Sequence, residues 1–134
     1  MEESRFQFKG FKITRSLIER KSDNSSKKIS LEFSPKGIIN ESEANFQLEL
    51  EVKIEDENKS FLIDILALAN YSFENGVANI SDLFYVNAPA LLFPYIRAYI
   101  STLTNLSGFE AVNLPTLNLT KVGDDLKNNI SIVK

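Results

Sequence analysis

Ten consecutive residues, 46–55, alternate strictly between apolar and polar side chains. Alternation with a period of two is typical of a β-strand that buries one face and leaves the other in water. The polar positions are mostly acidic, so the wet face of this strand is predicted to be acidic. A short polar loop at residues 56–59 separates it from an almost wholly apolar run at residues 61–71. The two runs therefore predict an antiparallel hairpin.

Two further strands are predicted upstream of this hairpin. Apolar residues alternate over residues 6–13 with a one-residue slip at Gly10, which indicates a β-bulge. They alternate again over residues 29–33, after a polar loop at residues 21–28. The Pro-Lys-Gly sequence at residues 35–37 then predicts a turn that ends this strand.

A long helix is predicted downstream, where the period of two is lost. Asn87 is a favourable N-cap, and Pro89 is tolerated in a first helical turn. A further short helical turn is expected just before it, at residues 81–85. Gly108 supplies a C-terminal stop. Because Pro94 lies inside this span, we expect either a kink or a start nearer Leu92.

Together these elements predict an α+β fold, a four-stranded antiparallel sheet with one long helix packed on it. The chain of 134 residues is long enough for one domain, and we expect its core over about residues 6–119. Residues 120–134 are polar at first, and we expect a loose tail or a short piece of helix there.

The predicted helix has two faces that both suggest packing. At about 100° per residue, one broad arc of the helix is large and apolar and is expected to cover the sheet. The opposite arc is made of small residues with a single charge, so another backbone can approach it closely. We predict an interface with a second copy of the chain, formed by Arg97, Ala98, Ser101, Thr102 and Asn105. The alternative is a solvent-exposed face that is rich in Ser and Thr.

The residue types that are missing exclude most enzyme chemistry. The chain has no His and no Cys, so Ser-His-Asp, Cys-His and zinc hydrolase sites are excluded, as are disulfides. Asp64, in an apolar strand, is a candidate general base, but no second acid–base group accompanies it in the sequence. We therefore predict a protein that is not an enzyme and that uses no metal or cofactor.

Charge and hydropathy predict a cytoplasmic protein without nucleic-acid or membrane partners. The N-terminus has no apolar signal segment, and the apolar stretch at residues 88–100 is too short to cross a bilayer. Residues 1–28 hold eight Lys and Arg against four acids, whereas residues 41–64 hold eight acids against two Lys. The acidic stretch disfavours binding to phosphates. We interpret the basic stretch as the solvated face of a strand, and a nucleic-acid patch is the alternative.

The segment at residues 87–119, NAPALLFPYIRAYISTLTNLSGFEAVNLPTLNL, resembles the signature of the SecB export-chaperone family. The resemblance is carried by the Leu-Phe-Pro-Tyr run at residues 92–95, by Arg97 two residues on, and by the Leu/Asn/Pro stretch that follows Gly108 and Phe109. Upstream, the run SFLIDI at residues 60–65 is similar to the family's strand with a Leu-x-acidic core. The order of four antiparallel strands and a long helix is also the family's, and the resemblance spans about residues 6–119.

The resemblance implies an ATP-independent holdase, a homotetramer built as a dimer of dimers with its long helices between two sheets. Such proteins wrap unfolded precursor proteins in apolar grooves and pass them to the SecA motor. Leu62 and Asp64 fall where the family's sheet contacts SecA, and three acids of the neighbouring strand extend that face: Glu49, Glu51 and Glu55. The alternative for these acids is a solvated face without a partner.

The departures from the family leave the partner open. The family's C-terminal SecA-binding tail is absent or replaced by residues 121–134. A dedicated chaperone for the antitoxin of a toxin–antitoxin pair, or a phage protein, is therefore the alternative to a general export chaperone. A monomeric carrier with a closed apolar pocket for a small molecule is a further alternative.

A holdase needs exposed apolar area, and aromatic side chains supply large contact areas at a low entropic cost. The candidate client-binding residues are Phe33, Tyr71, Phe73, Phe84, Tyr85, Leu91, Phe93, Phe109, Leu114 and Leu117. We expect Phe84, Tyr85 and Phe109 in loops or at the ends of elements, and therefore exposed. The alternative is that about half of the ten belong to the core.

Overall fold

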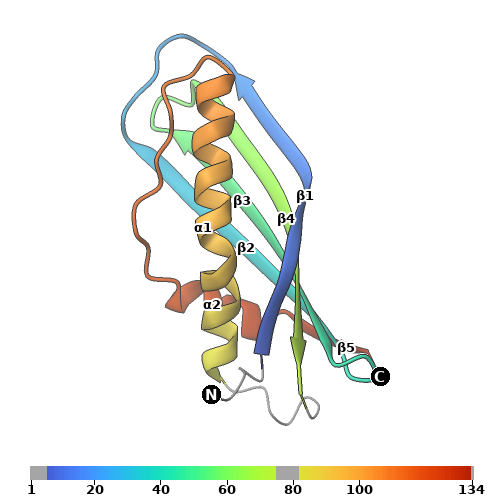
Figure 1. Ribbon diagram of the computed structural model, residues 1–134. Helices are drawn as coiled ribbons and strands as arrows, with labels where there is room; N and C mark the ends of the chain where they lie inside the picture. The colour runs from blue at the N-terminus through green and yellow to red at the C-terminus, as the bar shows by residue number, and fades with distance from the viewer. Residues whose placement is uncertain (1–5, 75–81, 134) are drawn as a thin grey trace.

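The computed structural model describes residues 6–74 and 82–133 (Figure 1). The elements follow one another as β1 (Phe6–Arg20), β2 (Ile29–Asn40), β3 (Asn45–Asp56), β4 (Phe61–Phe73), α1 (Asp82–Leu106), α2 (Thr120–Lys127) and β5 (Ile130–Val133). Figure 1 shows α1 lying across one face of the sheet, with the segment after it running back alongside the helix to α2. The α+β class predicted from the sequence is confirmed.

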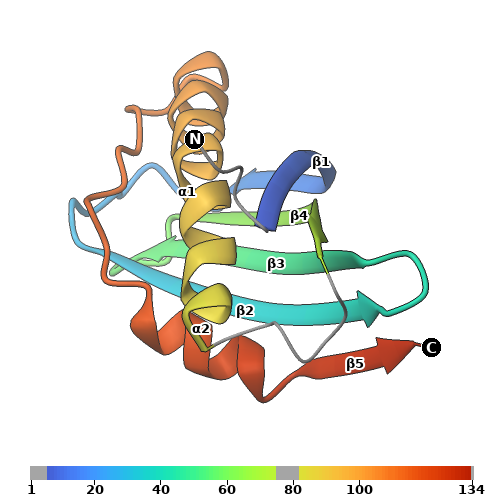
Figure 2. The same ribbon diagram turned by 60° about the horizontal axis from the view of Figure 1, so that its bottom comes forward.

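The strands form one sheet in the order β1-β4-β3-β2-β5 (Figure 2). The predicted hairpin is confirmed, because β3 and β4 pair antiparallel along their lengths. On either side of this hairpin, β1 pairs antiparallel with β4, and β2 pairs antiparallel with β3. The predicted count of four strands is wrong, because β5 adds a fifth by pairing in parallel with β2.

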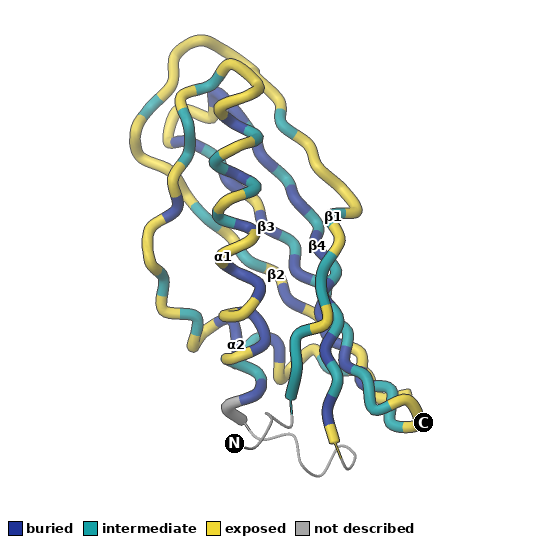
Figure 3. The backbone as a smooth tube through the Cα atoms, viewed as in Figure 1, coloured by how far each residue is buried: buried dark blue, intermediate teal, exposed yellow. Residues whose placement is uncertain are grey.

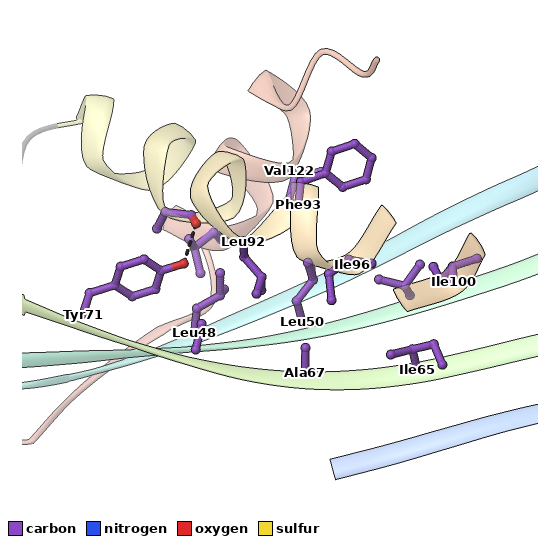
Figure 4. Close-up of a cluster of buried hydrophobic side chains, with 14 of the residues drawn as sticks. Leu48, Leu50, Ile65, Ala67, Tyr71, Leu92, Phe93, Ile96, Ile100 and Val122 are labelled. Carbon is purple, nitrogen blue, oxygen red and sulfur yellow. Dashed lines mark hydrogen bonds between the residues drawn. The ribbon is translucent and has the colours of Figure 1, made fainter. Parts of the chain in front are cut away.

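The core lies between α1 and the sheet. Every second residue of β3 and β4 is buried, and for β3 the alternating sequence predicted this (Figure 3). Leu92, Ile96 and Ile100 bring the apolar arc of α1 onto this face and have no exposed surface (Figure 4). The Tyr71 hydroxyl donates a hydrogen bond to the carbonyl of Ala88, which ties β4 to α1. Burial raises the pKa of Tyr71, so the phenol stays a donor.

Strand β1 contains two bulges. The first is the one predicted at Gly10, where the pairing register with β4 shifts and φ is 115°. The second lies between Ile13 and Arg15 and was not predicted. It puts these two residues on opposite faces, because Ile13 lies beside the buried Ala67 and Arg15 beside the half-buried Leu66.

Strand β2 continues through residues 35–37, so the turn predicted there is wrong. Proline cannot donate a hydrogen bond to a second neighbouring strand. Because β5 pairs with β2 only from Gly37 onward, Pro35 lies where β2 has a single partner strand. A Cβ at Gly37 would lie 2.5 Å from Cδ1 of Ile130 and 2.6 Å from Cε2 of Phe46. The glycine therefore leaves the space that β5 needs.

Residues 120–133, predicted as a loose tail or a short piece of helix, form α2 and β5. Helix α2 buries Val122 and Leu126 in the core, and a Cβ at Gly123 would lie 2.8 Å from the Val86 side chain of α1. The helical expectation is confirmed and the loose tail is wrong. Strand β5 was missed because its four residues are too few to show an alternating pattern.

Helix α1 begins at Asp82, so the predicted starts at Asn87 and near Leu92 are both wrong. The short helical turn expected at residues 81–85 is, from Asp82 onward, the first part of α1, and Ser81 lies outside the described residues. The prolines that suggested a later start, Pro89 and Pro94, both lie within the helix.

Candidate functional site

Helix α1 ends in a reversal that begins the return segment, residues 107–119. Gly108 has a φ of 84°, and the N–H of Phe109 donates to the carbonyl of Thr104 over 3.0 Å. This is the geometry of a Schellman C-cap, and it confirms the stop predicted at Gly108. The reversal places Phe109 opposite the β1–β2 loop, residues 21–28.

A pocket of about 410 Å³ lies between the return segment and the β1–β2 loop. It is lined by Arg20, Ser25, Ser26, Lys27, Ile29, Ser60, Phe61, Gly108, Phe109, Glu110, Ala111, Val112 and Asn113. Most of these residues are half-buried or exposed, so the pocket opens to solvent. We call this open pocket the groove.

Two aromatic rings give the groove an apolar floor. The rings of Phe61 and Phe109 meet edge to face, with their centroids 5.7 Å apart. The Arg20 guanidinium lies 4.0 Å from the Phe109 ring centroid and donates to the carbonyl of Gly108 over 3.4 Å. Cation–π contact and hydrogen bond together hold Phe109 in place at the surface. The groove thus combines an apolar floor with a polar rim.

Side chains of α1 fasten the return segment to the helix. Arg97 donates through Nη2 to the carbonyl of Pro115 over 3.0 Å. The Ser101 hydroxyl donates to Oδ1 of Asn113 over 2.9 Å. Arg97 and Ser101 were predicted to face a second copy of the chain, and that interface stays a prediction. The two residues contact the chain's own return segment, which the helical pattern alone did not place there.

From Leu91 onward, α1 has seven exposed residues along its outer side, which we call the outer row: Leu91, Pro94, Tyr95, Ala98, Thr102, Asn105 and Leu106. Leu106 is 79% exposed and Tyr95 is 48% exposed. Tyr95 also contacts Phe11 of β1, with ring centroids 5.1 Å apart. Ala98, Thr102 and Asn105 belong to this row, so their place in an interface between copies stays a prediction.

Burial divides the ten predicted client-binding residues into two equal groups. Five lie in the core: Tyr71, Phe73, Phe84, Phe93 and Leu114. The expectation that these five form an exposed surface is wrong, because α1, the sheet and the return segment close over them. The other five are half-buried or exposed: Phe33, Tyr85, Leu91, Phe109 and Leu117. Of the ten, Phe109 lines the groove.

The three aromatics expected in loops or at element ends do lie at the ends of α1, but they are less exposed than predicted. Phe84 and Tyr85 lie in its first turn. Phe84 is buried, and its ring meets that of Phe46 edge to face with centroids 4.8 Å apart. Phe109 does lie just beyond a helix end, as predicted. Sequence reasoning missed the rest of the groove because both of its walls are irregular segments without periodicity; the stop at Gly108 was the one available signal.

The sheet face turned away from α1, the open face, carries the predicted partner-binding residues. Glu49, Glu51 and Glu55 project from β3, and Leu62 and Asp64 project from β4 beside them. The structure therefore brings these five residues onto one face, as the alternation of both strands implies.

Arg15 neutralises part of this acidic surface and was missed by the sequence analysis. Its Nη2 donates to a carboxylate oxygen of Glu51 and to Oδ1 of Asp64, the latter over 3.1 Å. The hydrogen bond to Asp64 raises the pKa of Arg15, so the guanidinium stays charged. Lys53 Nζ lies 3.8 Å from the other oxygen of Glu51. The unexpected second bulge in β1 is what turns Arg15 toward these acids.

Metal-binding clusters and membrane-spanning helices are both absent from the described part of the chain. In residues 6–74 and 82–133, no three acidic side chains gather where they could hold a metal ion. None of the helices formed by these residues is long and apolar enough to cross a membrane. The groove, with its aromatic floor and polar rim, suits an extended polypeptide segment with apolar side chains.

Comparisons with known proteins agree with this picture. A family model described as SecB, preprotein translocase subunit SecB, matches residues 13–124. A search of curated proteins found no match. Among solved structures, the chain is similar to the Mycobacterium tuberculosis SecB-like chaperone Rv1957, solved in complex with a ChAD peptide from the Rv1956 HigA1 antitoxin. The TM-score is 0.73 at 18% identity, over 84% of this chain and 91% of that one.

A second similar structure is that of a Streptococcus agalactiae protein of unknown function. Here the TM-score is 0.50 at 11% identity, over 83% of this chain and 97% of that one. At these identities, both likenesses show the fold.

Proposed function

The chain belongs to the SecB family, and from this premise we propose that it is an ATP-independent holdase, a chaperone without enzymatic activity. In this proposal, unfolded or precursor polypeptides bind in the groove between the β1–β2 loop and the return segment. Their apolar side chains contact the aromatic floor, and their backbone stays near the polar rim.

The main support for the proposal is the structure of the groove. Phe61 and Phe109 form an apolar floor that solvent can reach through an opening between two irregular segments. A chaperone must accept many sequences, and an apolar floor that carries no strict side-chain code allows this. Large aromatic rings add contact area at a low entropic cost.

The direct test compares unfolded and folded forms of one probe. Reduced, carboxymethylated α-lactalbumin stays unfolded in buffer, and its affinity can be measured by fluorescence anisotropy beside that of the native form. We expect at least about tenfold tighter binding of the unfolded form, a difference of roughly 1.4 kcal/mol. Equal affinity for both forms would contradict the proposal.

A groove variant tests where the probe binds. Phe109→Ala removes half of the aromatic floor, and we expect roughly three- to tenfold weaker binding of unfolded α-lactalbumin. Ile38→Ala is the matched control, because Ile38 is an exposed apolar residue on the open face, away from the groove. An equal loss in the two variants would place the client elsewhere.

We propose further that the assembly is a homotetramer, a dimer of dimers, with the outer row of α1 between protomers. The support is the exposure of Leu91, Tyr95 and Leu106 beside small residues on one side of a helix. Light scattering behind a sizing column should give about 60 kDa, four times 15.1 kDa. Ala98→Glu should lower this mass, whereas Asn118→Glu, on the exposed return segment, should not. A monomeric wild type would overturn the assembly.

Membership of the SecB family suggests two kinds of partner, SecA or a dedicated client, and one observation favours the dedicated client. Delivery to SecA would use the acids of the open face, but Arg15 already binds Glu51 and Asp64. We therefore favour a dedicated role, such as holding an antitoxin, the class of client named for the M. tuberculosis relative. Binding of purified SecA to the wild-type chain at low salt would reverse this preference.

A further inference from the structure

The β1–β2 loop is polar throughout, so it has no apolar residue to anchor it in the core. The turn between β3 and β4 holds the loop by hydrogen bonds at both ends. The N–H of Lys21 donates to the carbonyl of Ser60 over 2.6 Å, and the N–H of Glu57 donates to the carbonyl of Lys28 over 2.8 Å. The position of the loop is therefore set by this turn.

Asp56 adds a contact to the middle of the loop. One carboxylate oxygen accepts the N–H of Ser26 over 2.8 Å and the hydroxyl of Ser60 over 2.6 Å. The other oxygen accepts the N–H of Ser60 over 2.6 Å. Asp56 is only 3% exposed, so water competes poorly for these bonds.

The protonation state of Asp56 suits this role. Burial by itself raises the pKa of Asp56, but the hydrogen bonds from Ser60, Ser26 and Phe61 outweigh it and hold the pKa below its ordinary value. At neutral pH the side chain is therefore a carboxylate with two acceptor oxygens, as three convergent donors require.

Ser26, whose N–H is bound by Asp56, lines the groove. Ser26 and its neighbours form the wall that faces Phe109 across the opening. Asn58 adds one bond from the turn to the loop, through Nδ2 to the carbonyl of Asn24 over 3.1 Å. The distance between the two walls of the groove thus depends on a turn that reaches the groove only through Ser60.

We propose that Asp56 is a positioning residue for client binding, which fixes the β1–β2 loop as a preformed wall of the groove. The inference rests on the proposed function of the groove. The carboxylate of Asp56 is not among the groups that line the groove.

Asp56→Asn tests the role with little change of shape. The amide keeps one acceptor oxygen but turns an NH₂ group toward a backbone N–H, so one donor loses its partner. We expect hydrogen exchange at the Ser26 amide to accelerate roughly tenfold or more. The affinity for reduced, carboxymethylated α-lactalbumin should fall roughly three- to tenfold, with the mass by light scattering unchanged.

Asn40→Ala is the matched control at the opposite end of the sheet. Oδ1 of Asn40 accepts the hydroxyl of Ser42 over 2.9 Å and the N–H of Glu43 over 3.2 Å, so the variant also removes turn hydrogen bonds. Exchange at Ser26 and client affinity should match the wild type. Equal losses in both variants would show a general effect of stability and overturn the inference.

Ser26→Pro serves as a second variant if Asp56→Asn folds poorly. It removes the same hydrogen bond from the side of the loop, so on its own it should weaken the binding of reduced, carboxymethylated α-lactalbumin roughly three- to tenfold. Wild-type affinity in Ser26→Pro would overturn the positioning role.

The exchange and affinity readouts separate the possible failures. Unchanged exchange at Ser26 in Asp56→Asn would overturn the contact, and faster exchange with unchanged affinity would overturn the positioning role. If the wild type itself binds no unfolded α-lactalbumin, the proposed function fails and the positioning role falls with it. The exchange data would then still report whether Asp56 holds the loop.

Discussion

At the residue scale, single positions decide whether neighbouring segments can meet. Gly37 leaves room for Ile130 of β5 and Phe46 of β3, and Gly123 leaves room for Val86 of α1. The side chains around Gly37 are packed so closely that one added methyl group would overlap them.

Gly37→Ala is expected to destabilise the chain by about 1–3 kcal/mol, because its Cβ would overlap Ile130 and Phe46. Urea unfolding measures the effect, with Ser34→Ala, an exposed change on the same strand, as the control. An unchanged midpoint in Gly37→Ala would mean that β5 does not pack on β2 as described.

The lowered pKa of Asp56 predicts an acid-dependent loss of stability. A carboxyl group whose pKa is lower when folded stabilises the fold above its unfolded pKa, near 3.8, and this contribution disappears as the pH falls through the folded value. Wild-type stability should therefore decline between about pH 5 and pH 2 more steeply than that of Asp56→Asn. Parallel curves from denaturant unfolding at each pH would contradict the assignment.

At the element scale, the return segment depends on α1 for its position. Thr104 has no exposed surface; its hydroxyl donates to the carbonyl of Ile100 and accepts the N–H of Val112, each over 2.9 Å. Residues 108–113 of the segment line the groove, so the helix and one groove wall form a single packed unit.

Thr104→Val keeps the side-chain shape but leaves the N–H of Val112 without its acceptor. We expect a loss of about 1–3 kcal/mol in unfolding free energy and faster hydrogen exchange at Val112. Thr116→Val, an exposed change in the return segment, should stay close to the wild type. Equal effects of the two substitutions would argue against the contact.

The sequence predicted the elements that have long patterns and missed those that depend on context. The β3–β4 hairpin follows directly from its alternation, and the bulge at Gly10 and the stop at Gly108 follow from backbone freedom. The start of α1 was missed because Pro89 and Pro94 suggested a boundary, although packing on the sheet overrides that local preference. The continuation of β2 depended on a strand too short to detect.

At the scale of the whole molecule, the two faces of the sheet have different roles. One face is buried under α1, and the open face presents acids that Arg15 partly neutralises. The family resemblance read from the sequence is confirmed by the family match. The site was predicted less well, because a strand pattern identifies Tyr71 and Phe73 as apolar without saying which face a helix will cover.

Arg15→Ala should leave Glu51 and Asp64 without their shared cation and make the open face more attractive to basic ligands. We expect tighter binding of an oligolysine peptide at low salt and a steeper loss of binding as salt is added. Lys12→Ala removes the same charge from the same strand and serves as the control. Equal affinity of the two variants for the peptide would show that Arg15 does not set the charge of this face.

Site-specific cross-linking tests most directly whether unfolded polypeptide lies in the groove. A photoreactive amino acid at position 112, in the groove, would be compared with one at position 38, on the open face, in the presence of reduced, carboxymethylated α-lactalbumin. We expect cross-links to α-lactalbumin from position 112 and few from position 38. Cross-links only from position 38, or equal yields with native α-lactalbumin at position 112, would contradict it.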